Sequence, residues 1–201
     1  TGADSDKAVP HMQPESATAP ESQNNPQATA NPEKPANLLS PEKAAKIIKL
    51  RSEYALTYFK RATFDRLAAK YIHPEKGVHF YPMGLKAAGN SFAPKTFGNA
   101  MFNPVEYDWG KTDGGETPVK AKFVNYYKTY VYDEDFLKAS NVRFNEISFP
   151  GKYALSAAAI AQRFPNCVFA EYRKGASSLI LVFEPYDGPG IWYLVGVIHN
   201  S

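Results

Sequence analysis

The first 37 residues of the chain lack the side chains from which a folded core is built. Residues 1–37 contain no Leu, Ile, Phe, Tyr or Trp, and they carry six of the chain's 16 prolines. A segment with so little apolar surface to bury cannot offset the entropy lost when its backbone is ordered. The sequence therefore predicts a disordered tether, rich in Pro, Ala, Ser and Gln, over residues 1–37, followed by a single domain over residues 38–201.

The remaining 164 residues have the composition of one globular domain. They hold all 13 tyrosines and all 13 phenylalanines of the chain, and a segment of this length builds one sizeable core more readily than two. No apolar run approaches the roughly 20 residues of a membrane-spanning helix, and the start of the chain has no signal-peptide pattern. We expect one aromatic-rich domain without a membrane span.

Helices are predicted mainly in the first half of the domain. Ser40, Pro41 and Glu42 are typical of a helix start. Apolar periodicity extends this helix to about residue 60 and predicts a second helix over 63–72. A third helix is expected to begin at Thr117 and Pro118, and a fourth over 154–163. The apolar side of the first helix is assigned to a stripe of Ile47, Leu50, Tyr54 and Tyr58, with Ile48, Ala55 and Phe59 beside it.

Strands are predicted mainly in the second half. One strand is expected at 78–81, followed by a long irregular segment with a short strand near 105–109. Later strands are expected at 142–149, 168–172, 179–183 and 192–199, the last three as an antiparallel meander. This order predicts an α+β domain in which helices cover one face of a strongly bent, cone-like antiparallel sheet.

Positive charge gathers in the two predicted early helices. The tether carries a net charge of −3 and the domain +6, and residues 42–76 hold nine basic and four acidic side chains. Such a field attracts an anionic surface, whereas the alternative is an ordinary solvated helix face. The candidate partner-binding residues are Lys43, Lys46, Lys49, Lys60, Arg61 and Lys70.

Three segments, in order, resemble a signature of bacterial exported proteins and lipoproteins. They are HPEKGV at 73–78 with FYP at 80–82, VYDEDF at 131–136, and WYLVGVIHN at 192–200. That family is of uncharacterised function and is similar in pattern to the nuclear transport factor 2-like fold, a cystatin-like cone of bent sheet wrapped by helices around a pocket. The resemblance implies this fold and an exported setting, and it supplies no agreed catalytic residues.

The familiar catalytic and cofactor motifs do not occur. The chain has no His-Glu-x-x-His, Walker, Gly-x-Ser-x-Gly or dinucleotide-binding pattern. Its single cysteine, Cys167, excludes an internal disulfide and a cysteine-based zinc site. The adjacent Val168 and Phe169 indicate a buried thiol, with a reactive thiol as the alternative. We expect no metal and no cofactor.

Three side chains are weak candidates for catalysis. His199 ends a predicted strand, where it acts as an acid or base or as a structural histidine with its bonds satisfied. Glu146 and Glu171 fall on strands predicted to be neighbours. Paired carboxylates suit hydrolysis or proton transfer, and cross-strand ion pairs are the alternative.

Aromatic residues of the long irregular segment are candidates for ligand binding. The set comprises Phe80, Tyr81, Phe92, Phe97, Phe102, Tyr107 and Trp109. They line a ligand groove or anchor the segment in the core. From this set we select Tyr81, Tyr107 and Trp109, together with His79, which alternation places opposite Val78 and Phe80.

The sequence leaves three functional hypotheses. The first is a non-catalytic binding or interaction domain of a bacterial envelope protein, in the periplasm or at the cell surface, held by a lipid anchor before Thr1. The second is a small-molecule isomerase or hydrolase with an enclosed cone pocket. The third is a protein that docks through its basic helices. An envelope protein or an anionic surface component is the expected partner, and nucleic acid is not.

Overall fold

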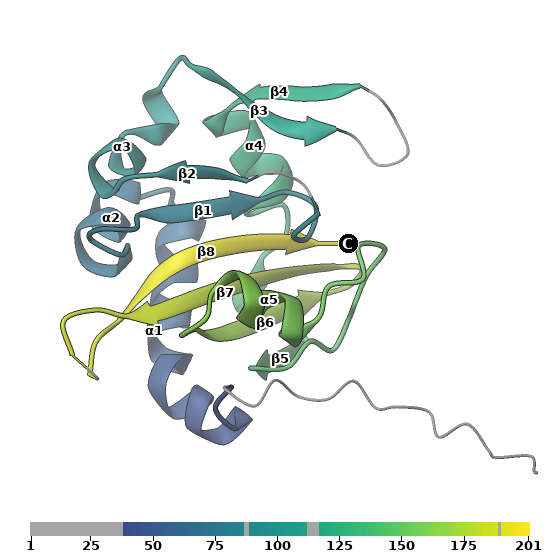
Figure 1. The fold of residues 1–201 in the computed structure, drawn as a ribbon. Coiled ribbons are helices and arrows are strands. Elements are labelled where there is room, and N and C mark those ends of the chain that lie inside the picture. Colours follow the sequence, from purple (N-terminus) through teal and green to yellow (C-terminus); the bar gives the residue numbers. More distant parts are fainter. Residues whose placement is uncertain (1–37, 87–88, 112–116, 189) are drawn as a thin grey trace, which may run out of the picture. The chain divides into compact units, whose positions relative to one another are not determined.

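The computed structural model describes residues 38–86, 89–111, 117–188 and 190–201, and the predicted tether over residues 1–37 lies outside them. The described residues form an α+β fold with five α-helices and a six-stranded sheet (Figure 1). The predicted fold class is therefore confirmed.

The two early helices are confirmed. α1 spans Pro41–Arg61, and the Ser40 hydroxyl accepts a hydrogen bond of 3.4 Å from the backbone N–H of Lys43. A side-chain oxygen at this position satisfies a donor that the helix itself leaves free. Ala62 caps the C-terminal end of α1 and adopts a left-handed conformation with φ 51°. α2 follows at Phe64–Tyr71.

The six-stranded sheet is mixed, which corrects the expectation of an antiparallel sheet. β6 (Val168–Lys174), β7 (Ser177–Pro185) and β8 (Trp192–Asn200) form the predicted antiparallel meander. β1 (Val78–Tyr81), however, runs parallel to β8 and pairs His79 with Gly196. β1 and β8 are far apart in sequence and no hairpin turn connects them. Their relative direction is therefore set by the packing of the segments between them.

Two short strands complete the sheet. β2 (Asn90–Phe92) pairs with β1 and β5 (Asn141–Phe144) pairs with β6, which gives the order β2-β1-β8-β7-β6-β5. β2 and β5 are therefore the edge strands. The sequence predicts a longer strand in place of β5, to residue 149. Asn145 ends it, because this residue adopts a positive φ of 52°.

A separate hairpin replaces the predicted helix start at Pro118. β3 (Glu106–Lys111) and β4 (Pro118–Lys122) form a two-stranded antiparallel sheet, and α4 (Phe123–Tyr130) begins only after it. Val119 and Ala121 are half-buried, whereas the lysines between and after them are exposed. This alternation is that of a strand, and it outweighs the helix-start signal of Pro118. The short strand predicted near 105–109 is confirmed as β3.

Helices lie on both faces of the six-stranded sheet, not on one face as predicted. α1 passes behind the sheet in Figure 1, whereas α5 (Ala157–Arg163) lies in front of it. β7 shows why both faces are covered, because Leu179, Leu181 and Phe183 belong to one buried cluster, while Ile180 and Val182 belong to another. An alternating strand that is apolar on both sides needs cover on both sides.

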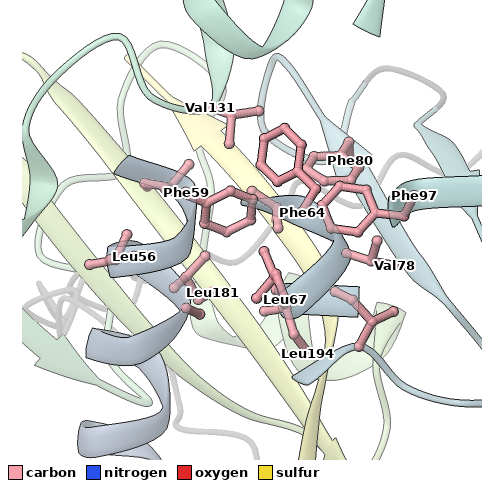
Figure 2. Close-up of a cluster of buried hydrophobic side chains, with 14 of the residues drawn as sticks. Leu56, Phe59, Phe64, Leu67, Val78, Phe80, Phe97, Val131, Leu181 and Leu194 are labelled. Atoms are coloured by element: carbon pink, nitrogen blue, oxygen red, sulfur yellow. The ribbon is translucent and has the colours of Figure 1, made fainter. Parts of the chain in front are cut away.

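The two faces carry two hydrophobic cores. The larger core lies between the sheet and α1, α2, α3 (Pro94–Gly98) and α4. Figure 2 shows part of it, with Phe59, Phe64, Phe80 and Phe97 gathered between the α1–α2 pair and the strands. The smaller core lies beneath α5 and contains Ile160, Phe164, Phe169, Val182 and Ile198.

Candidate functional site

The six predicted partner-binding residues are all exposed. Lys43, Lys46, Lys49, Lys60 and Arg61 lie on α1, and Lys70 lies on α2. Lys60 donates to Asp135 at 2.7 Å, so one of the six already has a counter-ion. Exposure fits both interpretations of these residues, the contact with an anionic surface and the ordinary solvated helix face.

An apolar groove opens beside the basic helix. It has a volume of about 360 Å³ and lies between α1, the short 3₁₀ helix η2 (Phe136–Lys138) and β5. Four large apolar side chains around it are exposed: Leu50 at 60%, Tyr54 at 48%, Leu137 at 39% and Val142 at 37%. We call this feature the α1–η2 groove. Its remaining lining residues are Glu53, Thr57, Phe136, Ala139 and Tyr172.

The groove exists because the sheet covers only part of the predicted apolar side of α1, the part with Ile48, Ala55 and Phe59. The helix buries Ala44, Ile48, Ala55 and Phe59 against the sheet. Leu50, which the sequence analysis assigns to the apolar side, is displaced from this stripe and faces out with Tyr54. The sequence contains enough apolar residues for a wider stripe than the sheet covers, and the excess forms one wall of the groove.

The base of the groove is held by a buried polar link. The hydroxyls of Ser52 on α1 and Tyr172 on β6 are joined by a hydrogen bond of 2.6 Å. Burial raises the pKa of Tyr172 to about 12, so the phenol stays protonated at physiological pH. This link ties α1 to the sheet at the groove base, where Phe136 is also fully buried.

Charge around the groove is mainly positive. Lys46 lies one helical turn before Leu50, and Lys60 lies close to Thr57 on the same helix. Lys138 at the other wall lies 3.9 Å from Asp135, which Lys60 also contacts. The hydrogen bonds from Lys60 and Tyr132 lower the pKa of Asp135. Glu53 is the acidic residue within the groove lining.

A second hollow lies on the opposite face of the sheet, beside the end of α5. It has a volume of about 250 Å³ and is lined by Lys76, His79, Arg163, Phe164, Pro165, Glu184 and Val195. We call it the α5 hollow. His79, one of the predicted ligand-binding residues, lies in its lining, and Tyr81 lies next to it, because the Tyr81 hydroxyl accepts a hydrogen bond of 2.8 Å from Nε of Arg163.

The ionisable groups of the α5 hollow influence one another. Lys76 forms an ion pair with Glu184, whose side chain is almost completely buried. Burial lowers the pKa of His79, and the positive charge of Arg163 lowers it further. The imidazole is therefore uncharged at neutral pH and offers one donor and one acceptor nitrogen.

The other predicted ligand-binding aromatics belong to the larger core. Trp109 is fully buried, stacks on Tyr126 at 3.5 Å and donates to the backbone oxygen of Ala121. Tyr107 packs against the same cluster. Phe80, Phe92 and Phe97 are also buried there, which confirms the core-anchor interpretation for them, whereas Phe102 is exposed. These rings pack together in the core between the sheet and α1 to α4.

His199 is held between two acceptors. Its Nδ1 lies 3.2 Å from the backbone oxygen of Pro82, and its Nε2 lies 3.3 Å from Oδ2 of Asp133. Both ring nitrogens of His199 therefore face acceptors of the protein itself. The geometry favours the structural interpretation of His199.

The two candidate carboxylates are not brought together. Glu146 follows β5 and is exposed, whereas Glu171 on β6 is fully buried. Oε2 of Glu171 accepts hydrogen bonds of 2.6 Å from both the N–H and the hydroxyl of Ser148. Glu146 and Glu171 therefore do not form the paired arrangement within the described residues.

Three further findings concern the thiol, metal-binding groups and membrane-spanning helices. Cys167 is buried, and this burial raises the pKa of its thiol to about 12, which agrees with the buried interpretation. Among the residues placed by the structure, no three His, Cys, Asp or Glu side chains are arranged to hold a metal ion. No helix within the described ranges has the length and apolar character needed to cross a membrane.

Sequence reasoning missed residues of both features. Leu137 and Val142 form the far wall of the α1–η2 groove, and Lys76, Arg163 and Glu184 belong to the α5 hollow. The signals for these roles are not local, because each feature joins segments that are distant in the chain. Arg163 alone had a local signal, since it ends a predicted helix beside an aromatic residue.

Comparisons of the chain with protein-family models, with curated proteins and with solved structures find no match.

Proposed function

We propose that residues 38–201 form a non-catalytic interaction domain that binds an apolar, acidic segment of a partner protein in the α1–η2 groove. One observation carries the proposal. Of seven large apolar side chains that are exposed in the described residues, four surround this single groove. Exposed apolar residues that are scattered need no explanation, but a contiguous set rimmed by polar residues is typical of a protein-binding surface.

The shape of the groove indicates the kind of partner. Its walls are α1 on one side and η2 with the edge strand β5 on the other. Grooves of this kind accept a segment that inserts large apolar side chains at regular spacing. The buried floor, with Phe136 and the Ser52–Tyr172 link, is fixed before binding, which lowers the entropy cost of association.

The charge of the rim indicates acidic residues in the partner. Three exposed lysines, Lys46, Lys49 and Lys60, lie on α1, and Lys138 lies on η2, the two elements that supply the walls, against Glu53 and Asp135. Complementary charge at the rim mainly raises the association rate and sets specificity, while the apolar contacts supply the affinity. In this proposal the basic residues beside the groove attract the acidic partner and set specificity.

A displayed library of random peptides tests the proposal. Selection on the wild-type chain should enrich peptides that combine at least two large apolar residues with acidic residues. Leu50→Glu places a charge on the groove wall and should weaken binding of the enriched peptides by about tenfold or more. Phe102→Glu is the matched control, since Phe102 is 88% exposed but lies outside the groove. Equal loss in both variants, or enrichment of basic peptides, would contradict the proposal.

The cellular setting is a second part of the proposal. We infer that the domain works in the bacterial envelope, held by a lipid anchor before Thr1, from the composition of residues 1–37 and the resemblance of the three segments. Labelling of cells with a radioactive fatty acid tests this. Label in the mature protein supports the anchor, and its absence from a protein that is nevertheless expressed excludes it.

A further inference from the structure

The α5 hollow has the features of a small-ligand site that is independent of the groove. It is built on β1, β7 and β8, where His79, Glu184 and Val195 lie, and it is closed at the side by Arg163, Phe164 and Pro165. Its volume of about 250 Å³ equals roughly eight water molecules at their share of about 30 Å³ in the liquid. It therefore accommodates a molecule of a few carbon atoms with one polar end.

Arg163 is the best-placed charged group for recognition. Its Nε–H donates to Tyr81, and its guanidinium lies over the rings of Tyr81 and Phe164 at 5.8 and 6.0 Å. These contacts fix the guanidinium plane at the rim. The bond to Tyr81 uses only Nε, so the terminal amino groups of the planar fork suit a carboxylate or phosphate.

The charge balance of the hollow selects between these two anions. Lys76 and Arg163 are positive and Glu184 is negative, and the neighbouring His79 is neutral at pH 7. The net charge of one positive unit is neutralised by a monoanion, whereas a dianionic phosphate leaves an excess negative charge beside the buried Glu184. Phe164 and Val195 offer an apolar wall that a bare inorganic anion does not use.

We propose that the α5 hollow binds a small molecule with one carboxylate and an apolar body. The carboxylate lies against Arg163 and His79, and the apolar part lies against Phe164 and Val195. Gly196 supports this arrangement, because a Cβ at this position would come within 2.8 Å of Cζ of Phe164. The glycine therefore lets the Phe164 ring approach β8 and form the wall.

Titration of the full chain with benzoate, followed by NMR of its backbone amides, tests the proposal. Benzoate should shift resonances around His79, Arg163 and Val195. Benzamide has the same shape without the charge and should bind about tenfold more weakly. Inorganic phosphate should also bind more weakly than benzoate. Absence of shifts at these residues with millimolar benzoate overturns the proposal, as does phosphate or benzamide binding equal to that of benzoate.

Two variants and a control assign the binding to this site. Arg163→Gln should weaken benzoate binding by about tenfold, since it removes the charge and the fork. Arg66→Gln removes an exposed arginine of α2 and should change nothing. Equal effects of the two variants indicate a general charge effect and overturn the proposal. The amide spectrum of each free variant verifies that it is folded.

The pH dependence gives a further readout that a structural role of His79 would not produce. The groups that face His79 are Arg163 from α5, Glu184 from β7 and Lys76 from the turn before β1. Protonation of His79 adds a positive charge, so benzoate should bind more tightly as the pH falls from about 8 to about 5.5. His79→Gln should remove this dependence and keep most of the affinity at pH 8. An unchanged pH profile in this variant overturns the role of His79.

Discussion

The two faces of the six-stranded sheet bury different kinds of side chain. On the α1–α4 face, rings pack on rings, and Phe123 alone contacts Phe64, Phe80, Phe92, Phe97, Trp109 and Tyr126. On the α5 face, a helix of seven residues and its flanking loops cover a smaller core that contains the buried polar side chains Glu171, Ser178, Glu184 and Asn200.

The two faces differ in the kind of side chain that they bury. Aromatic packing on the α1–α4 face contributes large buried area, although the hydroxyls of Thr63 and Tyr126 on that face have no hydrogen-bond partner among the described residues. Buried polar groups on the α5 face cost free energy unless they are paired. Oε1 of Glu171, Oγ of Ser178 and Oδ1 of Asn200 have no hydrogen-bond partner among the described residues. We therefore expect the first face to dominate the free energy of unfolding and the second to tolerate change better.

The largest effect is expected from a large-to-small change in the aromatic core. Phe123→Ala should lower the free energy of unfolding by about 4–5 kcal/mol, because six neighbouring rings cannot all collapse into the space. Phe164→Ala, beside the α5 hollow, should cost about 3 kcal/mol, since solvent reaches that cavity. Urea denaturation measures both. If Phe164→Ala lowered the free energy of unfolding as much as Phe123→Ala or more, the expected difference between the faces would be contradicted. If Phe123→Ala does not fold, Phe123→Leu and Phe164→Leu give the same comparison.

The next effect concerns the contact between α5 and β8. Gly196→Ala should cost about 1–3 kcal/mol, since the new methyl group would come within 2.8 Å of Phe164 and 3.2 Å of Val182. In a Phe164→Leu background the same change should cost much less, because the ring that it strikes is absent. A thermodynamic cycle of the four proteins gives the coupling energy. No coupling between the two sites would show that β8 can shift away from α5.

A smaller effect tests the polar link beneath the groove. Ser52→Ala should cost about 1 kcal/mol, because it leaves the buried hydroxyl of Tyr172 without its partner. Tyr172→Phe should lower the free energy of unfolding less in the Ser52→Ala background than in the wild type. Chemical denaturation at pH 7 measures both, and a stabilising Ser52→Ala would indicate that the link is not formed in solution.

The smallest effect has the opposite sign and uses the same substitution on the other face. Ser178 is also fully buried, but its hydroxyl has no hydrogen-bond partner among the described residues. Ser178→Ala should therefore be neutral or stabilise the protein by up to about 1 kcal/mol, because it removes an unsatisfied polar atom. Ser52→Ala is its matched control. A cost for Ser178→Ala as large as that for Ser52→Ala would mean that ordered water satisfies the Ser178 hydroxyl.

Local signals predicted much of the fold. The Ser40 cap, the start of α1, and the β6–β7–β8 meander were readable because caps, periodicity and turns act over a few residues. Pro118 misled the analysis, since proline fits both a helix start and the first residue of a strand. The parallel pairing of β1 with β8 had no local signal, because two segments at opposite ends of the domain form it.

The candidate sites were less predictable than the fold. His79 and Tyr81 were selected from the sequence and lie in or beside the α5 hollow, but their neighbours Arg163 and Glu184 come from other elements. The basic residues of α1 were found by charge alone. The adjacent groove was not, because the exposure of Leu50 depends on which stripe of the helix the sheet covers. Periodicity shows which helix residues can face a core, but the packing of the helix against the sheet decides which of them are buried.

The place of β8 in the sheet has a consequence for biosynthesis. β8, the last strand of the described residues, pairs with both β1 and β7, so it lies in the interior of the sheet and not at its edge. During synthesis β1 emerges well before β8 and lacks this neighbour until β8 has followed it. In that interval the nascent polypeptide exposes the unpaired edge of β1 to chaperones.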